Sequence, residues 1–222
     1  MDQVGKLLDR PRLYYNVDGV GELGAGFMLL GFALLQWLQL RAPEGAIWHR
    51  MDTFFVYVGL MCLAIHYGSK AIKKHITWPR TGFVAYRPHE RWRTAAIAAP
   101  LAALMVVGLS VAIRKDWDLT TPGALIGLAF VAVYAYGFAR TVRWKWIVAG
   151  VMALGSVAIA FLPANLLGAV AHDSSVTHPL RAALAGAWLL SVTLFGAIVF
   201  VSGGISFWLY LRHTQAPAEE GQ

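Results

Sequence analysis

Apolar residues in this chain gather into six long runs, and short polar segments separate them. Each run is continuous and long enough, at about 20 residues, to cross a bilayer as a helix, whereas a membrane barrel needs strands of about ten residues with alternating polarity. The pattern therefore predicts an all-α polytopic membrane protein with six transmembrane helices in a single domain, 20–211. The predicted spans are Val20 to Leu40, Thr53 to Ala71, Ala95 to Ile113, Thr121 to Ala139, Trp146 to Leu162 and Ala182 to Leu211.

Composition agrees with a membrane location. Apolar side chains make up 58% of the 222 residues and charged ones only 14%, whereas about a quarter of the residues of a soluble domain are charged. The segments between the spans are too short for a separate nucleotide-binding domain.

The distribution of lysine and arginine predicts the orientation in the membrane. Fourteen of the 19 such residues lie in segments on one side, which include the N-terminal segment 1–19, the loop 72–94 and the tail 212–222. Because cytoplasmic loops carry an excess of these residues, we expect both termini in the cytoplasm, with the tail disordered. The net charge of +7 predicts contact with anionic lipids of the cytoplasmic leaflet rather than with nucleic acid.

Glu22 is the most informative acid, because an ionisable group at the edge of a span either reaches the interface or pairs inside the bundle. If the first two spans form an antiparallel hairpin that turns near residue 46, Glu22 lies level with Lys70, and Gly26 lies opposite His66. We therefore expect a polar cluster of Glu22, His66, Tyr67 and Lys70 at the cytoplasmic end. The cluster is either a structural salt bridge or a proton or ion relay, since histidine titrates near neutral pH.

The loop 72–94 is basic and aromatic, which predicts binding to lipid head groups or to a partner protein. The residues expected to make this contact are Lys73, Lys74, Trp78, Arg80, Arg87, Arg91 and Arg93.

Part of this loop carries a recurring signature. The string Thr77-Trp78-Pro79-Arg80-Thr81-Gly82-Phe83-Val84, together with Asp18-Gly19 and the stretch from Glu22 to Gly26, resembles a group of uncharacterised bacterial multi-pass inner-membrane proteins with a Thr-aromatic-Pro-Arg-x-Gly-aromatic-Val motif. The resemblance implies a location in the bacterial inner membrane, and it attaches no activity or ligand.

No strong metal or cofactor site is predicted. His49, Asp52 and His172, expected on the face opposite the cytoplasm, are weak candidates for a metal site, and solvated loop polarity explains them more simply. His66 is the single histidine within the predicted spans, so this chain alone does not supply two axial imidazoles for a haem. A nucleophile paired with a base is not recognisable at membrane depth, so an enzyme is not favoured.

Two functions remain. The short loops and many glycines favour an accessory or structural subunit of a larger membrane complex, with other membrane subunits or further copies of itself as partners. The alternative is a small transporter or permease subunit that uses the polar cluster at Glu22 and His66.

Overall fold

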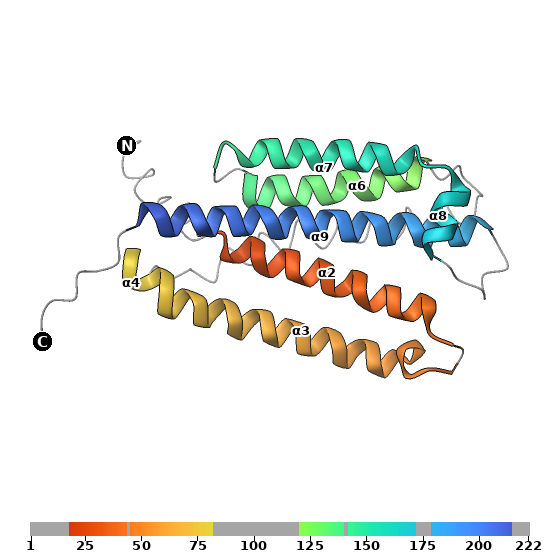
Figure 1. The fold of residues 1–222 in the computed structure, drawn as a ribbon, viewed down its shortest axis with the longest axis horizontal. Helices are drawn as coiled ribbons and strands as arrows, with labels where there is room; N and C mark the ends of the chain where they lie inside the picture. The colour runs from red at the N-terminus through yellow and green to blue at the C-terminus, as the bar shows by residue number, and fades with distance from the viewer. Residues whose placement is uncertain (1–17, 44, 82–119, 140–141, 172–178, 215–222) are drawn as a thin grey trace, which may run out of the picture.

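The computed structural model describes residues 18–43, 45–81, 120–139, 142–171 and 179–214, and within these ranges the regular elements are all helical. Long helices run side by side as a bundle (Figure 1). The main helices are α2 (Val20–Arg41), α3 (Met51–Ile72), α6 (Thr120–Tyr134), α7 (Lys145–Ala160) and α9 (Pro179–His213); shorter elements are η1 (Ile47–His49), η2 (Lys73–Thr77), α4 (Trp78–Thr81), η3 (Ala135–Ala139) and α8 (Ala164–Ala171).

The all-helical prediction is confirmed for the described residues. Among them, three helices are long and apolar enough to cross a membrane, and the count is four if α7 and α8, which meet at a bend of 102°, form one broken span. The predicted span Ala95 to Ile113 lies outside the described residues. The number of six spans stays a prediction.

Two helix boundaries differ from the predicted ones. The second helix does not stop near residue 71 but continues through the π-helical turn η2 and through α4 to Thr81, so the first part of the predicted loop 72–94 is helical. The helix predicted to reach Leu162 ends at Ala160, because Pro163 lacks a backbone N–H and disfavours helical geometry in the residue before it. The chain then turns into α8.

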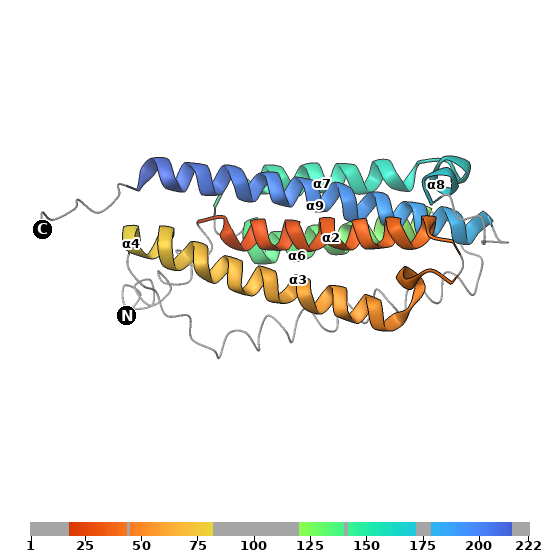
Figure 2. The same ribbon diagram turned by 60° about the horizontal axis from the view of Figure 1, so that its bottom comes forward.

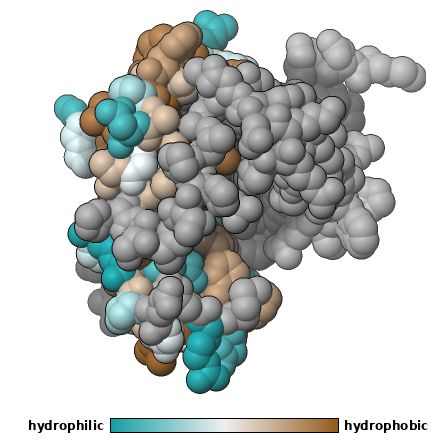
Figure 3. All heavy atoms as spheres, turned by 90° about the vertical axis from the view of Figure 1, so that its right-hand side faces the viewer, coloured by the Kyte–Doolittle hydropathy of each residue, from teal (hydrophilic) through white to brown (hydrophobic). Residues whose placement is uncertain are grey.

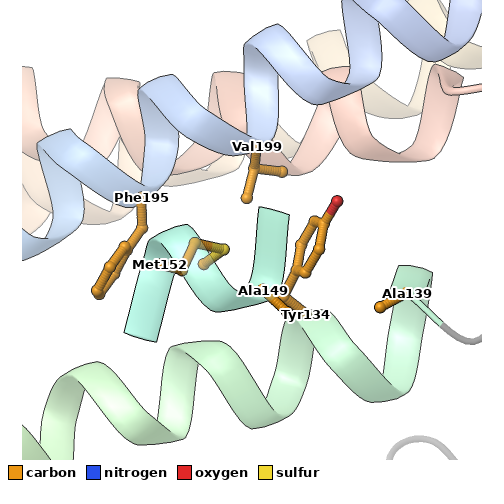
Figure 4. Close-up of a cluster of buried hydrophobic side chains, with 6 residues drawn as sticks. All are labelled: Tyr134, Ala139, Ala149, Met152, Phe195 and Val199. Atoms are coloured by element: carbon orange, nitrogen blue, oxygen red, sulfur yellow. The ribbon is translucent and has the colours of Figure 1, made fainter. Parts of the chain in front are cut away.

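Helix α9 forms the centre of the described bundle. It packs against α2, α6, α7 and α8, whereas α3 lies at the outside of the bundle and mainly contacts α2 (Figures 1 and 2). Six buried side chains from α6, η3, α7 and α9 form a hydrophobic cluster, shown in Figure 4: Tyr134, Ala139, Ala149, Met152, Phe195 and Val199.

The two ends of the bundle differ in where their polar residues lie. At one end α2 begins, α6 ends, α7 begins and α9 ends (Figure 1); we call this the polar end because it holds the buried residues Asp18, Glu22, Lys73 and Lys145. The opposite end, which faces the viewer in Figure 3, shows hydrophilic patches beside hydrophobic ones.

Glycines bring α2 and α9 into close contact. A Cβ atom at Gly203 would lie 2.6 Å from the backbone nitrogen of Leu23, and one at Gly26 would lie 2.5 Å from the backbone nitrogen of Phe200. Side-chain-free positions of this kind let helix backbones approach each other in membranes. Gly203 is thus a packing site within one continuous helix, whereas a Cβ at the adjacent Gly204 would meet nothing within 4 Å.

We expect Gly203→Ala to lower the free energy of unfolding by about 1–3 kcal/mol, because the new methyl group overpacks the α2–α9 contact. Gly204→Ala is the matched control, since its Cβ would meet nothing within 4 Å; it should leave stability unchanged or raise it slightly, as alanine favours helices. Thermal unfolding of the purified protein in detergent measures both. Equal effects of the two substitutions would contradict the packing role of Gly203.

Candidate functional site: a buried polar centre

Glu22 lies in the first turn of α2 and is completely buried, with 0% of its surface exposed. Its carboxylate accepts a hydrogen bond from the Lys145 ammonium at 2.7 Å, which is also an ion pair between two fully buried side chains. The other carboxylate oxygen accepts a bond from the Tyr134 hydroxyl at 2.9 Å. A buried carboxylate is tolerated because partners of this kind replace its hydration.

Two serines of α9 complete the shell around this carboxylate. Ser202 donates to Glu22 at 3.2 Å and lies 2.9 Å from the Tyr134 hydroxyl, and Ser206 donates to Glu22 at 3.1 Å. The two serines are four residues apart, so they share one face of α9. Together the five side chains join α2, α6, α7 and α9, and we call the set of Glu22, Tyr134, Lys145, Ser202 and Ser206 the polar centre.

Tyr134 links the polar centre to the apolar core. Its ring packs among the buried side chains of Figure 4, and its hydroxyl points from α6 toward α9 and α2. An aromatic ring with a polar tip suits such a boundary between apolar and hydrogen-bonding surroundings.

A second ion pair lies next to the first. The Lys73 ammonium is 3.3 Å from the Asp18 carboxylate, and both side chains are nearly buried. Asp18 also accepts a hydrogen bond from the backbone N–H of Val20 at 3.1 Å, which supports the start of α2. Burial raises the pKa of the Asp18 carboxyl, and the positive charges of Lys73 and Lys145 partly oppose this.

Gly19 holds Asp18 in place. Its φ of +72° is a left-handed conformation that other residues rarely adopt, and a Cβ there would collide with the Gly203 carbonyl and with Ser206. Glycine therefore lets the chain turn tightly against α9 just before Glu22.

Two π-helical segments adjoin the charged groups. Lys73 is the first residue of η2, and Tyr134 immediately precedes η3. Such wide turns are rare and frequently occur at functional sites.

The structure places Glu22 in a buried cluster but with other partners than the sequence predicts. Lys145 takes the place expected for Lys70, while His66, Tyr67 and Lys70 are exposed on α3. The reason is the orientation of α2: the face with Glu22 and Gly26 packs on α9. The face that meets α3 carries Gly24 and Gly31 instead, next to Ile65 and Met61 respectively.

The basic and aromatic residues predicted to contact lipid or a partner from the loop 72–94 do not form one exposed surface in the structure. Lys73 is buried against Asp18, and Arg80 donates hydrogen bonds to the carbonyl oxygens of Leu211 and Thr214 at 3.2 and 3.0 Å, so both act within the chain. Lys74 is exposed and Trp78 is partly buried. The remaining residues of that prediction, Arg87, Arg91 and Arg93, lie outside the described residues.

The three weak candidates for a metal site, His49, Asp52 and His172, are not brought together in the part of the chain that the structure describes. Asp52 is exposed and forms an ion pair with Arg50 at 2.6 Å. The side chain of His49 and all of His172 lie outside the described part of the chain, in which no group of three or more His, Cys, Asp or Glu side chains suits a metal.

Sequence reasoning missed Lys145, Tyr134, Ser202 and Ser206. The hydropathy pattern places Lys145 just outside the predicted span Trp146 to Leu162, but its place between Trp144 and Trp146 at the start of this apolar run is a signal for a residue at the edge of the bundle. A second signal is the pair of serines, Ser202 and Ser206, which lie four residues apart in an otherwise apolar span.

Comparisons of the chain with protein-family models, with curated proteins and with solved structures return no match.

Lys145→Met leaves a buried carboxylate without its countercharge, and we expect it to cost about 3–5 kcal/mol of stability. The double variant Glu22→Gln with Lys145→Met removes both charges and should recover most of that loss. Thermal unfolding of the two variants beside Glu22→Gln gives the coupling energy of the pair.

Neutralisation of the exposed pair at the other end, Arg50→Met with Asp52→Asn, serves as the control and should leave the unfolding temperature unchanged. Additive losses for Glu22→Gln and Lys145→Met would show that the pair is not coupled.

Proposed function

We propose that the chain is a multi-pass protein of the bacterial inner membrane and a subunit of a larger membrane complex, and that α3 faces its partner. The observation that carries this proposal is the position of His66. It is exposed on α3, near the middle of the candidate span Asp52–Arg80. Its ring stands edge-on to the neighbouring Tyr67 ring, with 5.2 Å between the ring centroids.

A polar imidazole that faces lipid is unfavourable, because hydrocarbon offers no hydrogen-bond partner. A neighbouring transmembrane helix with a hydrogen-bonding group on its surface removes this cost. Such polar contacts between helices contribute about 0.6–2 kcal/mol each in membranes.

The surroundings of His66 suit the approach of another helix. Cys62 lies one turn away and Gly59 two turns away, and both are exposed on the same side of α3. The Cβ position of Gly59 meets nothing within 4 Å in this chain. Small residues next to a polar one are typical of helix interfaces in membranes.

Charge at the polar end supports a cytoplasmic location for that end. Its two described acids, Asp18 and Glu22, are buried and paired with lysines, whereas the exposed charged residues there are basic: Lys70, Lys74, Arg143 and Arg212. Exposed Trp146 and Trp208 lie at the same level, and Arg212 stacks over Trp208 at 5.4 Å. Such a belt favours the anionic lipids of the cytoplasmic leaflet.

The single cysteine permits a direct test of the α3 face. In native membranes, a photoreactive benzophenone maleimide attached to Cys62 should form a discrete adduct with another membrane protein after illumination. The matched control moves the cysteine to α7, as Cys62→Ser with Leu154→Cys, where the side chain is 72% exposed; this probe should react mainly with lipid.

Mass spectrometry of the adducts identifies the partner. Lipid adducts alone from both positions would refute the proposed face, and a cross-link only between two copies of this chain would make it a homo-oligomer instead of a subunit of a mixed complex.

A further inference from the structure

We propose that the partner helix at α3 carries an aspartate or glutamate whose carboxylate lies between His66 and Lys70. The proposal rests on the proposed function and identifies the chemistry of its partner, which is a transmembrane helix of a protein other than this chain. Three observations carry it: the spacing of His66 and Lys70, the positive charge of the α3 face, and the positions of the acids in this chain.

His66 and Lys70 lie one turn apart on α3, and both side chains are exposed. Residues four apart on a helix share one face, with about 5–6 Å between their Cβ atoms. A carboxylate has two oxygen atoms that accept hydrogen bonds. One oxygen can accept a bond from the His66 imidazole while the other accepts one from the Lys70 ammonium. A single acidic side chain between the two residues therefore serves both.

The charge of this face favours a partner of opposite sign. Lys70 falls within the predicted span Thr53 to Ala71, near its end, so that its ammonium reaches lipid head groups only by extending along α3. Charged side chains inside membrane spans commonly pair with an opposite charge on a neighbouring helix. A carboxylate on the facing helix balances the single positive charge of Lys70 where it lies.

The acids in the described part of this chain are already paired. The two described acids of the polar end, Asp18 and Glu22, are buried in ion pairs with lysines. The third described acid, Asp52, lies at the opposite end of α3 and pairs with the nearby Arg50. The carboxylate that suits Lys70 therefore comes from outside the described residues.

A second copy of the chain does not suit this position. Glu22 is the only acidic residue in the six predicted spans, and its carboxylate is buried in the polar centre. Two copies with the same orientation in the membrane that met through α3 would bring their Lys70 side chains together, where like charges repel. The acid therefore belongs to a different membrane protein.

The shape of the same face lets a short acidic side chain reach these groups. Gly59 and Cys62 continue the line of His66 away from the polar end, and α3 lies at the outside of the described bundle (Figure 2). Small residues allow two helix backbones to approach closely in a membrane. A helix packed over Gly59 and Cys62 thus brings its next turn toward His66 and Lys70.

The test changes the charge of Lys70 and measures the adduct of the benzophenone probe on Cys62 in native membranes. Lys70→Glu should reduce the protein adduct by about tenfold or more, because two carboxylates then face each other. Lys70→Arg keeps the charge and should retain the adduct. Arg212→Glu is the matched control: it makes the same charge change at the polar end, on the exposed surface of α9, and should leave the adduct unchanged.

Mass spectrometry of the cross-linked peptide then locates the acid. The partner segment attached to the probe should contain an aspartate or glutamate within about two helical turns of the attachment point. A change of that residue to lysine should restore the adduct of the Lys70→Glu chain, because the ion pair forms again with its charges exchanged. A segment without an acidic residue, or an exchange that restores nothing, would contradict the proposal.

The outcomes distinguish the acid from the partner surface itself. Equal adducts from Lys70→Glu and the unchanged chain would overturn the acid and leave α3 as the partner surface. Equal losses in Lys70→Glu and Arg212→Glu would show that the charge acts through lipid head groups, which also overturns it. A chain that forms no protein adduct, or that cross-links only to a second copy, would refute both the acid and the mixed complex.

Discussion

The ion pair between Glu22 and Lys145 determines how the described helices meet. Two opposite charges at zero exposure must stay together, because either one alone is costly in a low-dielectric interior. Glu22 stands on α2 and Lys145 on α7, and α9 lies between them with two serines turned toward the carboxylate. The pair therefore sets the rotation of α2 about its axis. The remaining contacts follow from that rotation.

Close packing and charge burial support each other at the α2–α9 contact. Without a side chain at Gly203, the backbone of α9 approaches Glu22 and Leu23 directly, which excludes lipid and water from the carboxylate. A dry environment strengthens the electrostatic attraction between the charges. The same environment makes an unpaired charge more unfavourable. Packings of α2 on α9 that separate Glu22 from Lys145 are therefore strongly disfavoured.

The helices themselves were predictable from the sequence, since continuous apolar runs leave the backbone few alternatives in a membrane. Val20 and the end of the last helix fall close to where the hydropathy pattern places them. The partner of Glu22 was not predictable in this way. Hairpin register compares only neighbouring helices, whereas Lys145 comes from a helix 123 residues away along the chain. Nor does a count of basic residues separate lysines that face water, such as Lys74, from those that are buried, such as Lys145.

The bend between α7 and α8 has a consequence for the surrounding bilayer. With 16 residues, α7 is about 24 Å long, which is less than the hydrocarbon thickness of about 30 Å. The chain turns by 102° after α7, and apolar Phe161 and Leu166 are exposed at the turn and in α8. Such hydrophobic mismatch is relieved by local thinning of the membrane. A bilayer around α7 would therefore have to thin locally, or the bend and α8 would have to lie inside it as the second half of one broken span.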